Sequence, residues 1–200
     1  MFLKPDFPAL SGLSAVFGGV VAALALPGVV RPAAAARLWR AFPRSVWPGR
    51  VMAAVALAWT AAWTPSFLVE FVPSAAPSLL PLLQYALAAM VLATCFALPE
   101  LLSCRAAGML MALVPTPMLS AAQWHPSPCR YLVIAVAYAM VVAGMFAIAR
   151  PWLLRDAVFA ANETPRRARA VSAAFLALAG VFLFCAAFVF PVAPGAQALR

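Results

Sequence analysis

The sequence PELLSCR, Pro99 to Arg105, interrupts two long apolar runs near the middle of the 200-residue chain. The runs cover residues 79–98 and 106–121. A single helix through both would be about 64 Å long at 1.5 Å per residue, about twice the thickness of the hydrocarbon core of a bilayer. The interruption therefore predicts a turn at a membrane surface between two helices that each cross the bilayer.

The composition indicates an integral membrane protein, because 66% of the residues are hydrophobic, 10% are charged, and the charges cluster between apolar runs. The runs are continuous rather than alternating, which excludes a β-barrel. We expect an all-α fold, a polytopic transmembrane bundle of six helices in a single domain over residues 1–200, with basic and aromatic segments at the membrane interface. The expected helices cover residues 8–30, 51–72, 79–98, 102–121, 131–149 and 170–192. Thr164 and Pro165 are expected to cap and begin the last helix, and Pro115 and Pro117 to make the far end of the fourth helix irregular.

The basic residues predict the orientation of the chain. One side of the six-helix arrangement carries five Arg in residues 31–50, then Arg105, then five Arg in residues 150–169. The opposite side carries Lys4, Arg130 and Arg200. Basic loops stay in the cytoplasm, so we expect both termini outside. The dominance of Arg over Lys, with abundant Ala, is typical of GC-rich bacterial genomes and favours a bacterial inner membrane.

The first basic segment, residues 31–50, mixes Arg with Trp and Phe, which is typical of the headgroup region. It predicts an orienting cytoplasmic loop, and contact with anionic lipid is a further expectation, whereas no nucleic-acid partner is expected. Because so many Arg follow the first apolar run, that run is expected to stay in the membrane rather than be cleaved as a signal peptide. The candidate headgroup ligands are Arg37, Arg40, Arg44, Arg166, Arg167 and Arg169.

Small residues recur every four positions in several expected helices and predict close helix packing. One ladder, made of alanine alone, lies in the fifth helix and is expected to face another helix; it consists of Ala135, Ala139, Ala143 and Ala147. Two similar ladders consist of Ala54, Ala58, Ala62 and Ser66 in the second helix, and of Gly108, Ala112, Thr116 and Ser120 in the fourth.

A compact polar group, Glu100, Cys104 and Arg105, is the candidate for catalysis. Cys104 follows Glu100 by four residues, so the two would share a face of a helix. An acid, a thiol and a guanidinium could serve lipid-phosphate chemistry. The simpler interpretation is a charged membrane-surface turn, with Glu100 at a helix start and Arg105 orienting the chain. We predict no catalytic site.

The middles of the six expected helices contain no ionisable side chain, which argues against ion or proton coupling. A channel for an uncharged solute stays an alternative. Its candidate lining residues are Glu70, Gln84, Thr94, Thr116, Ser120 and His125. His125 and Cys129 could form half of a metal site, but two intervening prolines and the lack of further ligands predict a solvated loop, with no metal or cofactor.

The run from Pro99 to Gly108, with Trp124-His125-Pro126 and the pair Arg155-Asp156, resembles uncharacterised multi-pass membrane proteins from bacteria such as Verrucomicrobia. The resemblance implies a bacterial membrane protein and no particular activity, substrate or cofactor. The leading hypothesis is a subunit or accessory factor that acts through helix packing. The alternatives are a small permease or channel for an uncharged solute, and a lipid-acting enzyme that uses Glu100 and Arg105.

Overall fold

The computed structural model describes residues 10–71, 102–123 and 127–190, together with the single positions 82, 85, 86, 89, 93 and 125. Within this part the chain forms helices joined by short turns and no strand, which confirms the all-α expectation. Most of the expected third helix, residues 79–98, lies outside the described residues. Four described segments are long and apolar enough to cross a membrane: Leu10–Val30, Leu102–Gln123, Arg130–Ala149 and Pro165–Val189.

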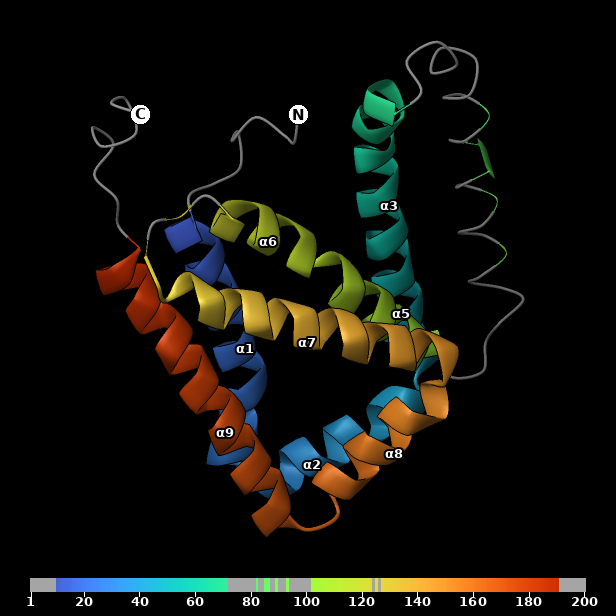
Figure 1. The fold of residues 1–200 in the computed structure, drawn as a ribbon. Helices are drawn as coiled ribbons and strands as arrows, with labels where there is room; N and C mark the ends of the chain where they lie inside the picture. The colour runs from blue at the N-terminus through green and yellow to red at the C-terminus, as the bar shows by residue number, and fades with distance from the viewer. Residues whose placement is uncertain are drawn as a thin grey trace. The chain divides into compact units, whose positions relative to one another are not determined.

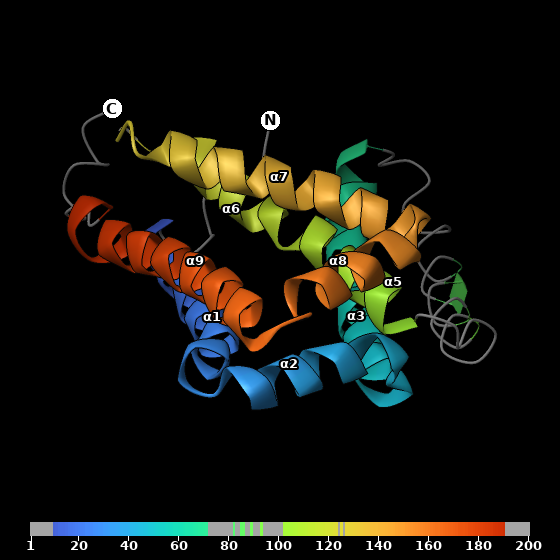
Figure 2. The same cartoon turned by 90° about the horizontal axis from the view of Figure 1, so that it is seen from below.

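The chain packs as two compact units, and the first is built on the pair α1 (Leu10–Val30) and α9 (Pro165–Phe184). These helices lie side by side in both ribbon views (Figures 1 and 2). Beyond α9 the chain makes a π-helical turn, Cys185–Val189, that also contacts α1. The unit also contains most of α2 (Pro32–Ala41), α6 (Pro115–Gln123) and the first part of α7 (Arg130–Ala149). Its buried core consists of Leu10, Met118, Ala122, Val133, Phe182, Cys185 and Phe190.

The second unit is built on α3 (Val46–Phe71) and α5 (Leu102–Leu113), which pack against each other. A 3-10 turn, Phe42–Arg44, precedes α3 and contacts α5. The end of α7 and the start of α8 (Pro151–Ala161) complete the unit. The α3–α5 contact buries Ala53, Leu102 and Ala106, with Met52 packed against them.

Two apolar helices end at the same dipeptide, Arg followed by Pro. Arg31 is the single residue between α1 and α2, and Arg150 is the single residue between α7 and α8. The residue before a proline is disfavoured in a helix, whereas proline itself suits the first helical position. The Arg31 carbonyl accepts the N–H of Ala34 at 3.1 Å, and the Arg150 carbonyl accepts that of Leu153 at 3.0 Å. Each Arg therefore closes an apolar helix and opens the next one.

Proline and threonine also set the other helix boundaries. The Thr164 hydroxyl accepts the Arg167 N–H at 3.2 Å, and Pro165 begins α9, which confirms the cap expected from these two residues. The helix starts five residues before the expected residue 170. The expected irregularity near Pro115 is confirmed as well, because α5 ends at Leu113 and α6 begins at Pro115.

Within the described part of the chain, three of the four ladder positions predicted for α7 are not packed against another helix. Ala135, Ala139 and Ala143 are exposed, and of the four residues only Ala147 is buried. The residues that α7 buries are spaced by three, four or seven positions instead: Val133, Ala137, Gly144 and Ala147. At 3.6 residues per turn a four-residue step overshoots a full turn by about 40°, so a ladder of four members sweeps about 120° around the helix. The fourth member, Ala147, therefore lies on a different side of α7 from the first three.

The other two ladders also include exposed positions. In α3, Ala54, Ala58 and Ala62 are exposed, while the neighbouring residues Ala53, Ala56 and Leu57 are buried. The side chain of Ser66 lies outside the described part. The ladder of the fourth expected helix is confirmed at Gly108 and Ala112, which both contact α7, but Thr116 is exposed.

Candidate functional site

The start of α5 holds two of the three residues proposed for catalysis. Cys104 is fully buried, and Arg105 is half-buried with its Nε atom shielded from solvent. Glu100 lies outside the described residues. The Cys104 thiol is closed off from solvent, and its neighbours Leu102 and Ala106 pack against Ala53 of α3.

The neighbouring residue Ser103 shows how tightly α5 packs on the start of α3. Its hydroxyl donates a hydrogen bond to the backbone carbonyl of Ser45, the residue that precedes α3. A Cβ atom on Gly49 would lie only 2.7 Å from the Ser103 backbone nitrogen. The Gly49 position therefore lets the two backbones touch, and the hydrogen bond from Ser103 ties α5 to the residue that precedes α3.

The candidates for a solute path do not form a polar cavity within the described part. Thr116 is exposed on α6, and the Ser120 hydroxyl donates to the Pro117 carbonyl of its own helix at 3.0 Å. Glu70 lies in α3 at a position whose side chain is outside the described part. Gln84 and Thr94 also lie outside the described residues.

His125 is buried, so the expectation of a solvated loop is wrong for this residue. Its side chain packs edge-on against Phe190, with ring centroids 5.1 Å apart. The Ser127 N–H donates to Nδ1 at 3.2 Å, which assigns the proton to Nε2. Nε2 is shielded from solvent and has no hydrogen-bond partner within the described part. The π-helical turn after α9 brings Phe190 over the imidazole, a long-range contact that the local sequence did not indicate.

Arg130 completes this turn between α6 and α7. Its guanidinium donates to the His125 carbonyl at 2.8 Å and to the Gln123 carbonyl at 3.3 Å. It also lies 5.1 Å from the ring centroid of Tyr131. These carbonyls follow or end α6 and would otherwise have no helical donor, so Arg130 has a local structural role in addition to its charge.

A second polar site lies where α1 ends beside the start of α9. A Cβ on Gly28 would overlap the Ser172 hydroxyl and would lie 3.8 Å from the Ala168 carbonyl oxygen. Arg31 follows Gly28 by three residues, and Arg169 follows Ala168 directly. The contact between Gly28 and α9 therefore brings basic residues of two helices to the same end of the first unit.

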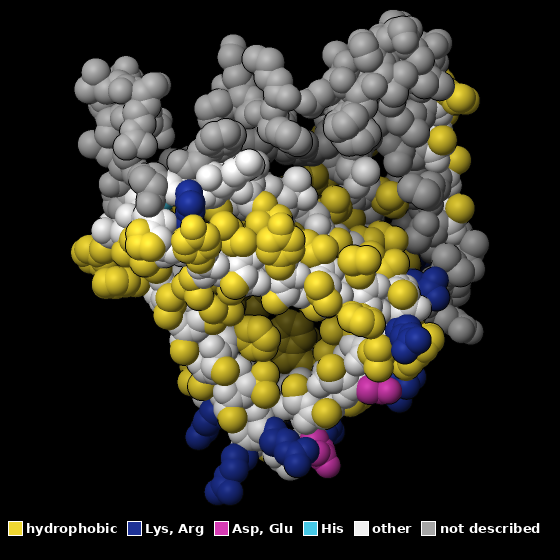
Figure 3. Space-filling model, in the orientation of Figure 1, with side chains coloured by type: hydrophobic (Ala, Val, Ile, Leu, Met, Phe, Trp, Pro, Cys, Tyr) yellow, Lys and Arg dark blue, Asp and Glu magenta, His cyan; other side chains and the backbone are white. Residues whose placement is uncertain are grey.

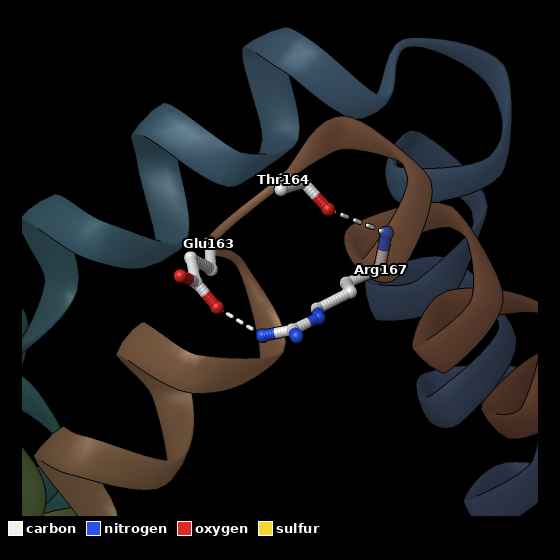
Figure 4. Close-up of polar contacts among 3 residues, drawn as sticks. All are labelled: Glu163, Thr164 and Arg167. Carbon is white, nitrogen blue, oxygen red and sulfur yellow. Dashed lines mark hydrogen bonds and ion pairs between the residues drawn. The ribbon is translucent and has the colours of Figure 1, made fainter.

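The acidic side chains that the structure describes form ion pairs with neighbouring Arg residues. Glu163 pairs with Arg167, whose backbone N–H also bonds Thr164 (Figure 4). Asp156 pairs with Arg155 at 2.8 Å. On the face drawn in Figure 3, Arg side chains gather around the end of α9 that follows α8. Among the described residues, no ion pair involves the exposed residues Arg31, Arg37, Arg166 and Arg169.

The remaining candidate headgroup ligands, Arg40 and Arg44, differ in their exposure to solvent. Arg44 is exposed, whereas Arg40 is half-buried with its Nε shielded from solvent. Neither Arg31 nor Gly28 was among the candidate site residues predicted from the sequence. Two features of the sequence could have identified them: the Arg-Pro dipeptide that recurs at the end of an apolar helix, and the glycine about one turn before it.

Within the residues that the structure describes, no three His, Cys, Asp or Glu side chains gather as possible metal ligands. Comparisons with protein-family models, with curated proteins and with solved structures give no match to this chain.

Proposed function

We propose that this chain is a small multi-pass protein of the bacterial inner membrane that acts through helix packing, as a subunit or accessory factor of a membrane complex. In the full arrangement six helices cross the membrane, both termini lie outside, and the basic segments face the cytoplasm. The four described candidate spans and the distribution of Arg support this arrangement.

One observation carries the proposal: within the described part, α7 leaves uncovered the side that carries three alanines beside the exposed Val142 and Phe146. Ala135, Ala139 and Ala143 are exposed, while the opposite stripe of the helix packs within the protein. Small side chains let a second helix approach closely, and such approach is what drives association between helices in a bilayer. We infer that this face receives a helix of a partner.

The polar groups described above give less support to a channel. A groove at the corner between α1 and α2, between Leu26 and Leu38, is lined almost entirely by apolar side chains. The Ser120 hydroxyl is bonded within its own helix. A path for a polar solute needs hydrogen-bonding groups along its wall, which these features do not provide.

The test is co-purification of the tagged full chain in mild detergent. Ala139→Leu adds bulk to the exposed face without filling the core, so it should reduce the recovery of a reproducible partner by at least several-fold. Ala23→Leu is the matched control, because Ala23 is an exposed alanine on α1. Equal recovery with both variants, or no reproducible partner, would exclude the proposal.

A further inference from the structure

The corner between α1 and α2 forms an open apolar groove. Its volume is about 350 Å³, within the range of small-molecule sites. Its lining residues are Leu26, Pro27, Val30, Arg31, Ala34, Ala35 and Leu38. Val30 and Leu38 are 64% and 68% exposed, so the described part of the chain leaves this apolar surface uncovered.

The residues that line this groove include one positively charged side chain. Arg31 is the only charged residue among those that line it, and it is exposed. Gly28 contacts Ala168 and Ser172, so the start of α9 lies at the same end of the first unit as the groove. Arg166 and Arg169 are exposed at this start of α9. The described acidic side chains do not offset these charges, because they pair with Arg155 and Arg167.

The groove lies at the end of α1, an apolar helix that is long enough to span a membrane. The α1–α2 corner is made by one residue, Arg31, so α2 begins where α1 ends. A short helix with exposed Leu and Arg side chains in this position is typical of the headgroup and upper acyl region of a bilayer. A ligand of the groove would therefore come from the lipid phase.

We propose that the α1–α2 corner binds one acidic phospholipid, with its phosphate at Arg31 and part of an acyl chain in the groove lined by Val30, Ala34 and Leu38. Arg166 and Arg169 add to the attraction of the anionic headgroup. The planar guanidinium of Arg suits a phosphate group, and the apolar lining suits a hydrocarbon chain. The site goes beyond the proposed packing function and does not depend on it.

The experiment is native mass spectrometry of the full chain released from detergent, titrated with phosphatidylglycerol and, separately, with phosphatidylcholine of the same chain length. One phosphatidylglycerol should bind several-fold more tightly than phosphatidylcholine. Arg31→Gln should weaken phosphatidylglycerol binding about five-fold, as expected for one basic residue at an anionic membrane surface. Leu38→Ser should weaken the binding of both lipids, because it places a hydroxyl in the apolar groove.

The matched control is the double substitution Arg155→Gln with Asp156→Asn, which removes an exposed ion pair outside the proposed site without changing the net charge. It should leave phosphatidylglycerol binding unchanged. Equal binding of the two lipids, or unchanged binding in Arg31→Gln and Leu38→Ser, would overturn the proposal. Competition by millimolar inorganic phosphate, with the lipid chain making no difference, would identify a site for free phosphate and would also overturn it.

Discussion

Gly108 of α5 and Gly144 of α7 bring the backbones of the two helices into contact. A Cβ atom on Gly144 would lie 2.7 Å from the Gly108 carbonyl oxygen, and a Cβ on Gly108 would lie 2.9 Å from the Gly144 carbonyl oxygen. Side chains rarely approach a backbone atom this closely, and backbone cannot rotate out of the way. The crossing therefore requires the absence of a side chain at both positions.

Gly144→Ala should lower the free energy of unfolding by about 1–3 kcal/mol, as expected when an added methyl group forces packed backbones apart. The measurement is reversible unfolding in mixed micelles with increasing mole fraction of SDS. Gly19→Ala is the matched control, because a Cβ there has nothing within 4 Å. That control should be neutral or slightly stabilising, since Ala favours a helix over Gly by about 0.5–1 kcal/mol. Equal destabilisation by both substitutions would contradict the assigned crossing.

The contact between Gly28 and Ser172 predicts a compensating pair of substitutions. Gly28→Ala should destabilise the α1–α9 pair, because its methyl group would overlap the Ser172 side chain and lie 2.7 Å from the Ser172 Cβ. Removal of that side chain by Ser172→Gly should restore most of the lost stability in the double variant. The same SDS unfolding series measures both effects. Additive losses in the double variant would show that the two residues are not in contact.

The sequence predicted the helices better than it predicted their contact faces. Apolar length, the Thr164–Pro165 cap and the prolines near residue 115 identified elements that the structure contains. The ladder of Ala135, Ala139 and Ala143 did not identify the buried face of α7, because alanine is abundant and a four-residue period drifts around a helix. Gly144, the residue at the crossing, lies outside that ladder. Contact faces depend on the partner helix, which a local pattern does not specify.

The same limit applies to the candidate site. Cys104 was selected for its spacing from Glu100, but the packing of α5 buries it fully. His125 was expected in solvent, and the chain after α9 covers it with Phe190. Both outcomes depend on residues far away in the sequence. The Arg-Pro corners at Arg31 and Arg150 are local by contrast, and the dipeptide after an apolar run was a readable signal for them.

Ser103→Ala should lower the free energy of unfolding by about 1 kcal/mol, because it removes the hydrogen bond that joins α5 to the Ser45 carbonyl. Ser120→Ala is a suitable comparison. The Ser120 hydroxyl bonds a carbonyl of its own helix, so its loss breaks no contact between helices. Unfolding monitored by tryptophan fluorescence in SDS should separate the two variants. A Ser120→Ala loss as large as that of Ser103→Ala would contradict a linking role for Ser103.

The orientation of the chain can be tested with its own thiols, because their burial differs. Cys129 is half-buried in the turn before α7, whereas Cys104 and Cys185 are buried. In cells that carry a Cys95→Ala variant, a membrane-impermeant maleimide should react with Cys129 from outside, as the predicted orientation requires. Cys104 should stay unlabelled from either side until the protein is unfolded in SDS.

To test the cytoplasmic side of the membrane, a thiol must be introduced, and the exposed residue Arg37 is a suitable position for it. Arg37→Cys, in a chain whose four native cysteines are replaced by Ala, should react only after the membrane is permeabilised. Because Arg37 lies among five Arg in residues 31–50, its predicted side follows from the charge asymmetry alone. Labelling of Arg37→Cys in intact cells, together with no labelling of Cys129 in the first experiment, would mean that the chain has the opposite orientation. It would also place the basic corner at Arg31 on the outer leaflet.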